Sequence, residues 1–146
     1  MKTNTKQSKN IVIIIAMVLT ITVFSSCATK VVFLSSAVVP AAEGKITIKE
    51  DSNKNYEIKV KIANLADSQR LTPPKNVYVV WMLTEFNNTK NIGQIISSSG
   101  SMSNNMKASF ETVSSFRPIK IFITAEDDAD IQYPNAEVVL ITDYIN

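Results

Sequence analysis

The segment from residue 56 to residue 62 alternates apolar and charged side chains without a break. A tyrosine, two isoleucines and a valine occupy its even positions, and a glutamate and two lysines occupy its odd ones. Successive side chains of a β-strand point to opposite faces, so this pattern predicts a strand with one buried and one solvated side. No window after residue 27 shows a comparable helical stripe, and the sequence therefore predicts an all-β fold.

Further strands are predicted along the rest of the chain. Three segments show the same alternation: residues 44–50, 105–113 and 119–126. Two runs are apolar throughout, which is typical of central strands covered on both faces: residues 77–83 and 138–141. Two weaker strand candidates are residues 31–39 and 92–97. About seven or eight strands separated by turn-forming residues predict a single antiparallel, immunoglobulin-like β-sandwich over residues 44–146.

The first 26 residues have the layout of an export signal. Residues 1–10 are polar and carry only positive charge, and residues 11–24 are apolar apart from two threonines. Fourteen residues of helix would span about 21 Å, which is less than the roughly 30 Å of a hydrocarbon core. We therefore interpret this segment as a signal peptide.

The end of the apolar run, Ser25-Ser26-Cys27-Ala28, resembles the lipobox of bacterial lipoproteins. The resemblance implies cleavage before Cys27 and attachment of acyl chains such as palmitate to its thiol, with residues 27–43 as a tether or first strand and 27–30 as the tether itself. An uncleaved membrane anchor over 11–29 and an ordinary buried thiol are alternatives. The first two interpretations place the domain in the bacterial cell envelope. Cys27-Ala28-Thr29-Lys30 has no acidic run after the cysteine, and in this it resembles Bacteroidota lipoproteins kept on the periplasmic side more than those exported to the cell surface.

Composition excludes several kinds of chemistry. The chain has no histidine and one cysteine, which excludes a Ser-His-Asp or Cys-His catalytic centre, a histidine-ligated metal site and an internal disulfide. Three of the 15 basic residues lie in the leader, so twelve remain against 13 acidic residues. This balance gives no argument for nucleic acid as a partner, and we expect no cofactor.

A series of landmarks resembles the extracytoplasmic C-terminal domain of the anti-sigma-K factor family: Asn64-Leu65, Pro73-Pro74, Tyr78-Val79-Val80-Trp81-Met82, Ile92-Gly93-Gln94-Ile95, Ile121-Phe122-Ile123-Thr124-Ala125-Glu126 and Pro134. The resemblance covers about residues 44–145 and implies a sandwich outside the cytoplasm. Asp127-Asp128-Ala129-Asp130 replaces the Gly-Gly loop of that family. Only ten residues precede the apolar run, so no sigma-binding domain is expected. Two further motifs, Val39-Pro40-Ala41-Ala42-x-Gly44 before the first strong strand and Asn53-Lys54-Asn55-Tyr56 before the second, resemble small Bacteroidota lipoproteins that carry this sandwich.

Four carboxylates lie within five residues: Glu126, Asp127, Asp128 and Asp130. Oxygen-rich clusters suit Ca²⁺, but the spacing does not match an EF-hand, so a solvated acidic connection is favoured over a metal site. Loops on a rigid scaffold often carry binding, and we predict a binding loop at 127–135, with Asp127, Asp128, Asp130 and Tyr133, and a second candidate at 71–76.

Three glutamates near predicted strand ends, Glu85, Glu111 and Glu126, are candidates for a carboxylate-based enzyme. Such chemistry needs two acids roughly 5–9 Å apart across a cleft.

Trp81, the only tryptophan, is expected to share a strand face with Val79 and Leu83. Core packing is favoured for it over a sugar-stacking platform.

Two neighbouring predicted strands carry the lysine pairs Lys45 and Lys49, and Lys59 and Lys61. Each pair lies on one face of its strand. This face either contacts anionic lipid head groups or, as the favoured interpretation, is a solvated surface that blocks edge-to-edge aggregation.

The sequence thus predicts a non-catalytic, lipid-anchored protein of the cell envelope that acts as a binding or structural module. Its expected partners are the membrane, through acyl chains on Cys27, and an envelope protein or glycan. One alternative is a regulatory or sensor domain that acts through a separate membrane partner. The other is a carboxylate-based enzyme.

Overall fold

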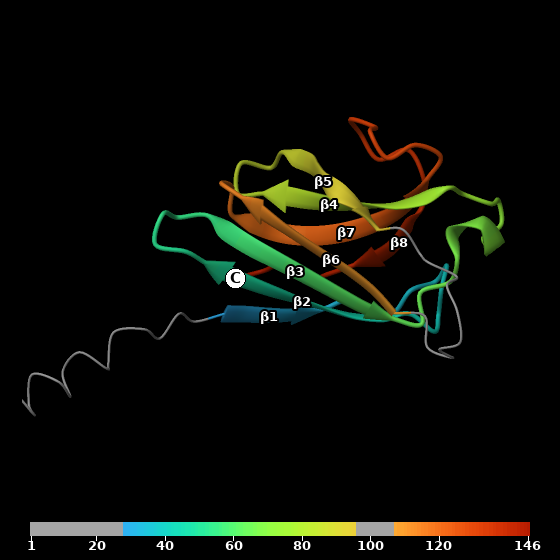
Figure 1. The fold of residues 1–146 in the computed structure, drawn as a ribbon, viewed down its shortest axis with the longest axis horizontal. Helices are drawn as coiled ribbons and strands as arrows, with labels where there is room; N and C mark the ends of the chain where they lie inside the picture. Colours follow the sequence, from blue (N-terminus) through green and yellow to red (C-terminus); the bar gives the residue numbers. More distant parts are fainter. Residues whose placement is uncertain (1–27, 96–106) are drawn as a thin grey trace, which may run out of the picture.

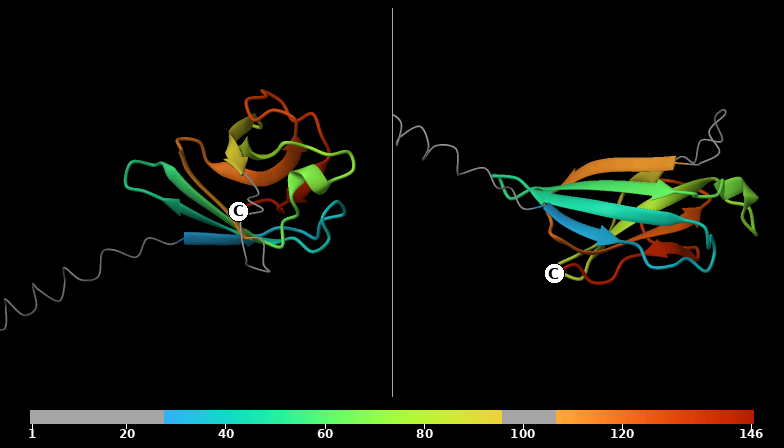
Figure 2. Two further views of the ribbon diagram at one scale, coloured as in Figure 1. Left: turned by 45° about the vertical axis from the view of Figure 1, so that its right-hand side comes forward. Right: turned by 90° about the horizontal axis from the view of Figure 1, so that it is seen from below.

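The computed structural model describes residues 28–95 and 107–146, which form two antiparallel sheets of four strands each (Figure 1). The first sheet has the strand order β1-β2-β3-β6, and the second has the order β5-β4-β7-β8. The sheets stack face to face as two layers (Figure 2), which confirms the predicted all-β sandwich. The leader, Cys27 and residues 96–106 lie outside the described residues.

The first sheet comprises β1 (Ala28–Val32), β2 (Glu43–Glu50), β3 (Tyr56–Ala63) and β6 (Lys107–Ser114). The alternation in β3 is confirmed, because Ile58, Val60 and Ile62 are buried while Lys61 is exposed. Burying one side of each strand fixes the register, since a slip by one residue would turn the apolar set toward water.

The second sheet comprises β4 (Val77–Thr84), β5 (Thr89–Ile95), β7 (Pro118–Glu126) and β8 (Val138–Ile141). Strand β4 pairs with β5 on one side and β7 on the other, and nearly all its residues are buried. The apolar run at 77–83 is therefore a central strand covered on both faces, as predicted. Strand β5 begins at Thr89, three residues earlier than predicted. The prediction missed Thr89, Lys90 and Asn91 because these polar residues show no strand pattern.

Two predictions about the sheet edges are wrong. Strand β8 is an edge strand, and Val138 is 40% exposed. Its apolar sequence has another cause: a register shift opposite Ile123 and Thr124 leaves Val139 and Leu140 both buried. Residues 28–30 are not the expected tether, because Ala28 opens strand β1 and pairs with Lys49, which agrees with the alternative of a first strand within 27–43.

The chain after β1 crosses from the first sheet to the second. The Leu34 amide donates to the Ile141 carbonyl, and the Ser36 hydroxyl donates to the Val139 carbonyl. These bonds cover part of the β8 edge, which would otherwise present unpaired backbone groups.

The open sides of the sandwich are closed by aromatic rings packed on glycines. A Cβ atom added at Gly93 would lie 2.5 Å from the Phe110 ring, and one added at Gly44 would lie 2.5 Å from the Phe33 ring. Gly93 also has a φ of +139°, a conformation that other residues rarely adopt. A larger side chain at either position would therefore require the ring that faces it to shift.

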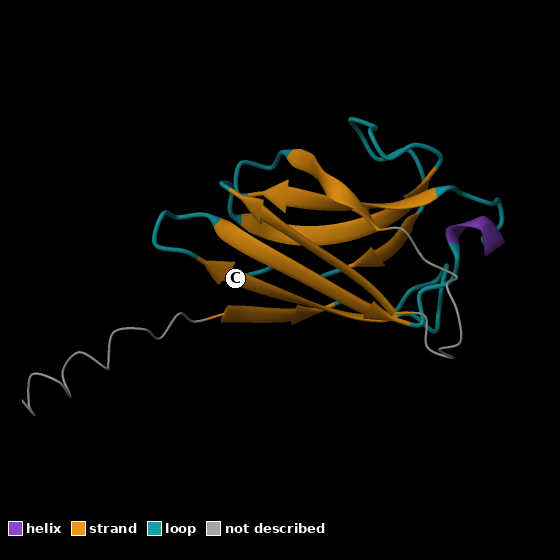
Figure 3. Ribbon diagram, in the orientation of Figure 1, coloured by secondary structure: helices purple, strands orange, loops and turns teal. Residues whose placement is uncertain are grey.

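The core between the sheets includes Tyr78, Val80 and Met82 of β4, Ile121 of β7, and Ile46 and Ile58 of the facing sheet. Tyr78 donates its hydroxyl to the Ala66 carbonyl at 3.0 Å. Burial, together with the negative charge of Asp67, raises the pKa of Tyr78 to about 12. The segment that follows Ala66 forms a short 3-10 helix, Ser68–Arg70, capped by the Asp67 side chain (Figure 3).

Across residues 28–95 and 107–146, no helix is long and apolar enough to cross a membrane.

Candidate functional site

The acidic loop of residues 127–136 folds over the outer face of the second sheet (Figure 1, upper right). Ala129 and Ile131 pack against a separate apolar cluster formed by Val77, Val79 and Trp81. Trp81 is fully buried there and stacks on Phe122, with ring centroids 6.3 Å apart. The predicted burial of Trp81 is confirmed, but its place is beneath the loop rather than between the sheets.

Glu126 holds the far end of this loop from beneath. Its side chain is only 2% exposed, and its Oε1 atom accepts hydrogen bonds from the backbone amides of Asn135 at 3.0 Å and Ala136 at 3.2 Å. The Thr124 hydroxyl donates to the same oxygen at 2.7 Å and accepts from the Trp81 indole at 2.8 Å. We call this set of bonds the Glu126 clamp. It joins the loop, β7 and the buried tryptophan in one network.

Two further contacts tie the loop to its neighbours. Lys75 donates from Nζ to Oδ2 of Asp127 at 2.8 Å, and the Asn76 side chain donates to the Asp127 carbonyl at 3.0 Å. The Asn91 amide group on β5 donates to the carbonyls of Ala129 at 2.8 Å and Ile131 at 3.1 Å. The two candidate binding loops, 71–76 and 127–135, are therefore neighbours in space.

A groove of about 850 Å³ runs between the acidic loop and strand β5. Its polar lining residues are Thr89, Lys90, Asn91, Gln94, Asp130 and Gln132. Tyr133 also lines the groove and is 78% exposed. Amide and carboxylate groups beside an exposed aromatic ring suit a polar ligand or a protein loop, since the ring supplies apolar contact and the polar groups supply direction.

The four carboxylates of the acidic segment do not converge. Glu126 points beneath the loop, Asp127 pairs with Lys75, and Asp128 accepts from the Asp130 amide at 3.0 Å. Within the part of the chain that the structure describes, no group of three or more histidine, cysteine, aspartate or glutamate side chains is placed to hold a metal ion. The arrangement of these four carboxylates therefore gives no support to the alternative of a calcium site.

The three glutamates considered for catalysis lie far apart in the fold. Glu111 is on β6 of the first sheet and pairs with Lys59, while Glu85 is exposed after the end of β4. Because Val77 pairs with Glu126, the eight residue-to-residue steps from Val77 to Glu85 separate Glu85 and Glu126 by roughly 25 Å. Of the three, only Glu126 is buried, and the partners of its side chain all belong to the Glu126 clamp.

The predicted lysine pairs lie on the outer face of the first sheet. Lys45 lies directly opposite Lys61, and Lys59 contacts Glu57 at 3.0 Å and Glu111 at 3.2 Å. Hydrogen bonds to Glu57 and then Glu111 raise the pKa of Lys59, and the bond with Lys59 lowers the pKa of Glu57.

Sequence reasoning identified the acidic loop and Tyr133 but missed the groove and the clamp. The groove needs Asn91 and Gln94, which lie on a strand whose polar start gave no signal. The apolar residues Ala129 and Ile131 within an acidic segment were the available sign that the loop packs on a surface.

No protein-family model, curated protein or solved structure matches this chain. The resemblance to the anti-sigma-K factor family therefore stays a prediction.

Proposed function

We propose that this chain is a non-catalytic, lipid-anchored binding module of the bacterial cell envelope, and that it binds an envelope protein or glycan through the groove between the acidic loop and β5. The observation that carries the proposal is the construction of the loop. It is fixed to the sheet by the Glu126 clamp and by Asn91, yet it leaves Tyr133 exposed beside the groove.

A fixed loop favours recognition because little conformational freedom is lost when a partner binds. An exposed aromatic ring of low side-chain entropy is a common anchor in such contacts. The groove offers no pair of neighbouring buried acids in the described residues that would favour hydrolysis instead.

The anchor is proposed from the lipobox resemblance at Cys27. Strand β1 begins at Ala28, so acyl chains on Cys27 would hold the sandwich within a few ångströms of the lipid surface. Mass spectrometry of the mature N-terminus tests this part, with a Cys27→Ser variant as control. Cleavage before residue 27 with an added diacylglycerol is expected, and an unmodified chain that starts at Met1 would contradict it.

The binding groove is tested by photo-crosslinking in intact cells. A Tyr133→benzoylphenylalanine variant is expected to yield a specific crosslinked product, either a protein of defined mass or a glycan smear. The matched control is the same substitution at Tyr144, which is similarly exposed but lies outside the groove. Equal products from both positions, or none from position 133, would contradict the assignment of this groove.

A further inference from the structure

The outer face of the first sheet is rich in lysine. Its outward positions on the four strands hold six lysines, Lys30, Lys45, Lys49, Lys59, Lys61 and Lys107, and three glutamates, Glu43, Glu57 and Glu111. The net charge of the sequence does not reveal this local excess of positive charge, because residues 27–146 as a whole are close to neutral.

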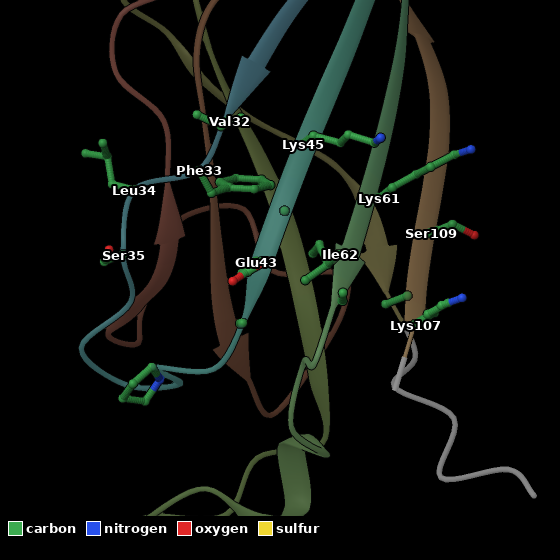
Figure 4. A pocket seen from close by; sticks show the side chains of 15 residues that line it. Val32, Phe33, Leu34, Ser35, Glu43, Lys45, Lys61, Ile62, Lys107 and Ser109 are labelled. Atoms are coloured by element: carbon green, nitrogen blue, oxygen red, sulfur yellow. The ribbon is translucent and has the colours of Figure 1, made fainter. Parts of the chain in front are cut away.

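The charges are unevenly distributed along this face. Two of the glutamates hold Lys59. Toward the other end, Lys45 lies opposite Lys61, and Lys107 lies near them on β6. In Figure 4 these three side chains point to the same side. Among the described residues, none of the three has an ion-pair partner within 4 Å. We call these three residues the lysine cluster.

Folding gives no reason for this arrangement. Like charges directly opposite each other on neighbouring strands destabilise a sheet. Lysines protect sheets from aggregation when they lie on edge strands. Here Lys45 and Lys61 lie on β2 and β3, which are the two central strands of the first sheet. The favoured sequence interpretation, protection against edge-to-edge pairing, therefore does not fit their position.

We propose that the outer face of the first sheet lies against the anionic head groups of phospholipids. The inference rests on the proposed function, because acyl chains on Cys27 would bring this face to the bilayer. Ala28 pairs with Lys49 at one end of β1, and Val32 pairs with Lys45 at the other. Four residues of strand separate the two points by roughly 13 Å. An acyl anchor and a cationic patch together hold a protein more firmly than either alone.

A hollow of about 920 Å³ borders the lysine cluster. Its lining includes Glu43 as well as the three lysines, and Phe33 and Ile62 lie on its core-facing side (Figure 4). The case for head-group contact therefore depends on the charges of the outer face and not on the shape of this hollow.

This placement sets the orientation of the whole domain. The acidic loop lies over the outer face of the second sheet, on the opposite side of the sandwich from β1 (Figure 1). When the first sheet rests on the bilayer, the groove beside β5 points away from the membrane. The head-group contact therefore presents the proposed binding groove to partners in the envelope.

Lysine footprinting of the full chain tests the inference. The protein, purified from bacterial membranes with its native N-terminus, is reconstituted on phosphatidylcholine vesicles and on vesicles with about a third phosphatidylglycerol. A water-soluble reagent acetylates the lysines, and mass spectrometry reads each site. We expect the lysine cluster to react roughly three to ten times more slowly on the anionic vesicles. The protection should disappear at about 1 M salt, where the Debye length is roughly 3 Å.

Two internal controls accompany the footprint. Lys90 and Lys120 belong to the second sheet and should react equally on both lipids. A Lys45→Gln/Lys61→Gln variant should remove the protection of Lys107, whereas Arg117→Gln/Lys120→Gln, which removes the same charge away from the groove and the cluster, should not. The first variant is expected to fold, because it relieves the repulsion between Lys45 and Lys61.

The outcomes separate the two proposals. Recovery of the chain on neutral vesicles reports the lipid anchor, and the difference between the two lipid compositions reports the docking face. Loss from neutral vesicles contradicts the anchor. Equal reactivity of the lysine cluster on both lipids, or protection of Lys90 and Lys120 instead, overturns the docking face.

Discussion

The two sheets of this sandwich have the same number of strands, but their outer faces differ in chemical character. The outer face of the first sheet is charged and open to solvent, and it carries the lysine cluster. The outer face of the second sheet is apolar at Val77, Val79 and Trp81 and is covered by the acidic loop. The pattern of apolar residues in a strand thus indicates whether one or both of its faces are buried. It does not indicate which distant segment of the chain covers the outer face.

Substitution of outward-facing residues should show the largest difference in stability between the outer faces of the two sheets. Trp81→Ala is expected to lower the free energy of unfolding by about 3–5 kcal/mol, because it empties a buried site beneath the loop. Val113→Ala removes an outward residue of the first sheet that is 65% exposed, and should change stability by less than about 0.5 kcal/mol. Urea unfolding monitored by circular dichroism measures both. Similar losses for the two variants would mean that the loop does not bury Trp81 in solution.

The Glu126 clamp provides the next largest effect. Glu126→Ala leaves two backbone amides and the Thr124 hydroxyl without their acceptor and should cost about 2 kcal/mol. Glu126→Gln keeps one acceptor oxygen and should cost less. Hydrogen exchange at Asn135 and Ala136 should accelerate in both variants.

The matching change on the first sheet is Glu111→Ala, at a side chain that is 58% exposed and pairs with Lys59. Surface ion pairs contribute little, so we expect no measurable change in unfolding. A clamp variant with unchanged hydrogen exchange at Asn135 would show that other contacts hold the loop.

Much of the fold follows from the sequence because strand patterns are local. The alternation in β3 and the apolar run in β4 each report burial at their own positions, and the structure agrees with both. Strand β8 shows the limit of this reasoning. Its run of four apolar residues indicated a central strand, but β8 lies at an edge, where the register shift beside Ile123 and the segment around Leu34 leave only Val139 and Leu140 fully buried. Both causes are long-range contacts that local patterns do not contain.

The site was less predictable for the same reason. The acidic residues and Tyr133 stood out by composition, and Glu126 was expected at the end of a strand, but the local pattern did not show that its side chain is buried while the aspartates that follow it are exposed. Its role depends on being the last residue of β7, two positions after Thr124, where the strand turns its side chain beneath the loop. The opposition of Lys45 and Lys61 likewise depends on the register between β2 and β3.

Tyr78 lies in the core between the two sheets, and its titration allows the stability of that core to be tested. Its pKa of about 12 lies above the ordinary value of 10.0, so the folded state favours the neutral phenol. This contribution is fully present below pH 10 and is lost as the pH rises from about 10 to 12, with a total on the order of 2 kcal/mol.

Tyr78→Phe removes the titration and the hydrogen bond to Ala66. The variant should be about 1 kcal/mol less stable at neutral pH, and its stability should fall less steeply between pH 10 and 12. Unfolding curves measured across this range compare the two proteins. Parallel losses of stability would show that other groups cause the alkaline transition.

The smallest effect distinguishes two lysines on neighbouring outward positions of β3. Lys61→Glu places a carboxylate opposite Lys45 and should raise stability by about 0.5 kcal/mol. Lys59→Glu places a third carboxylate beside Glu57 and Glu111 and should lower stability. Both changes should shrink at high salt, which urea unfolding at two salt concentrations can measure. If Lys61→Glu were as harmful as Lys59→Glu, folding itself would require Lys61. A gain in stability would mean that the fold tolerates a repulsive pair, as expected if the lysine cluster meets an anion outside the protein.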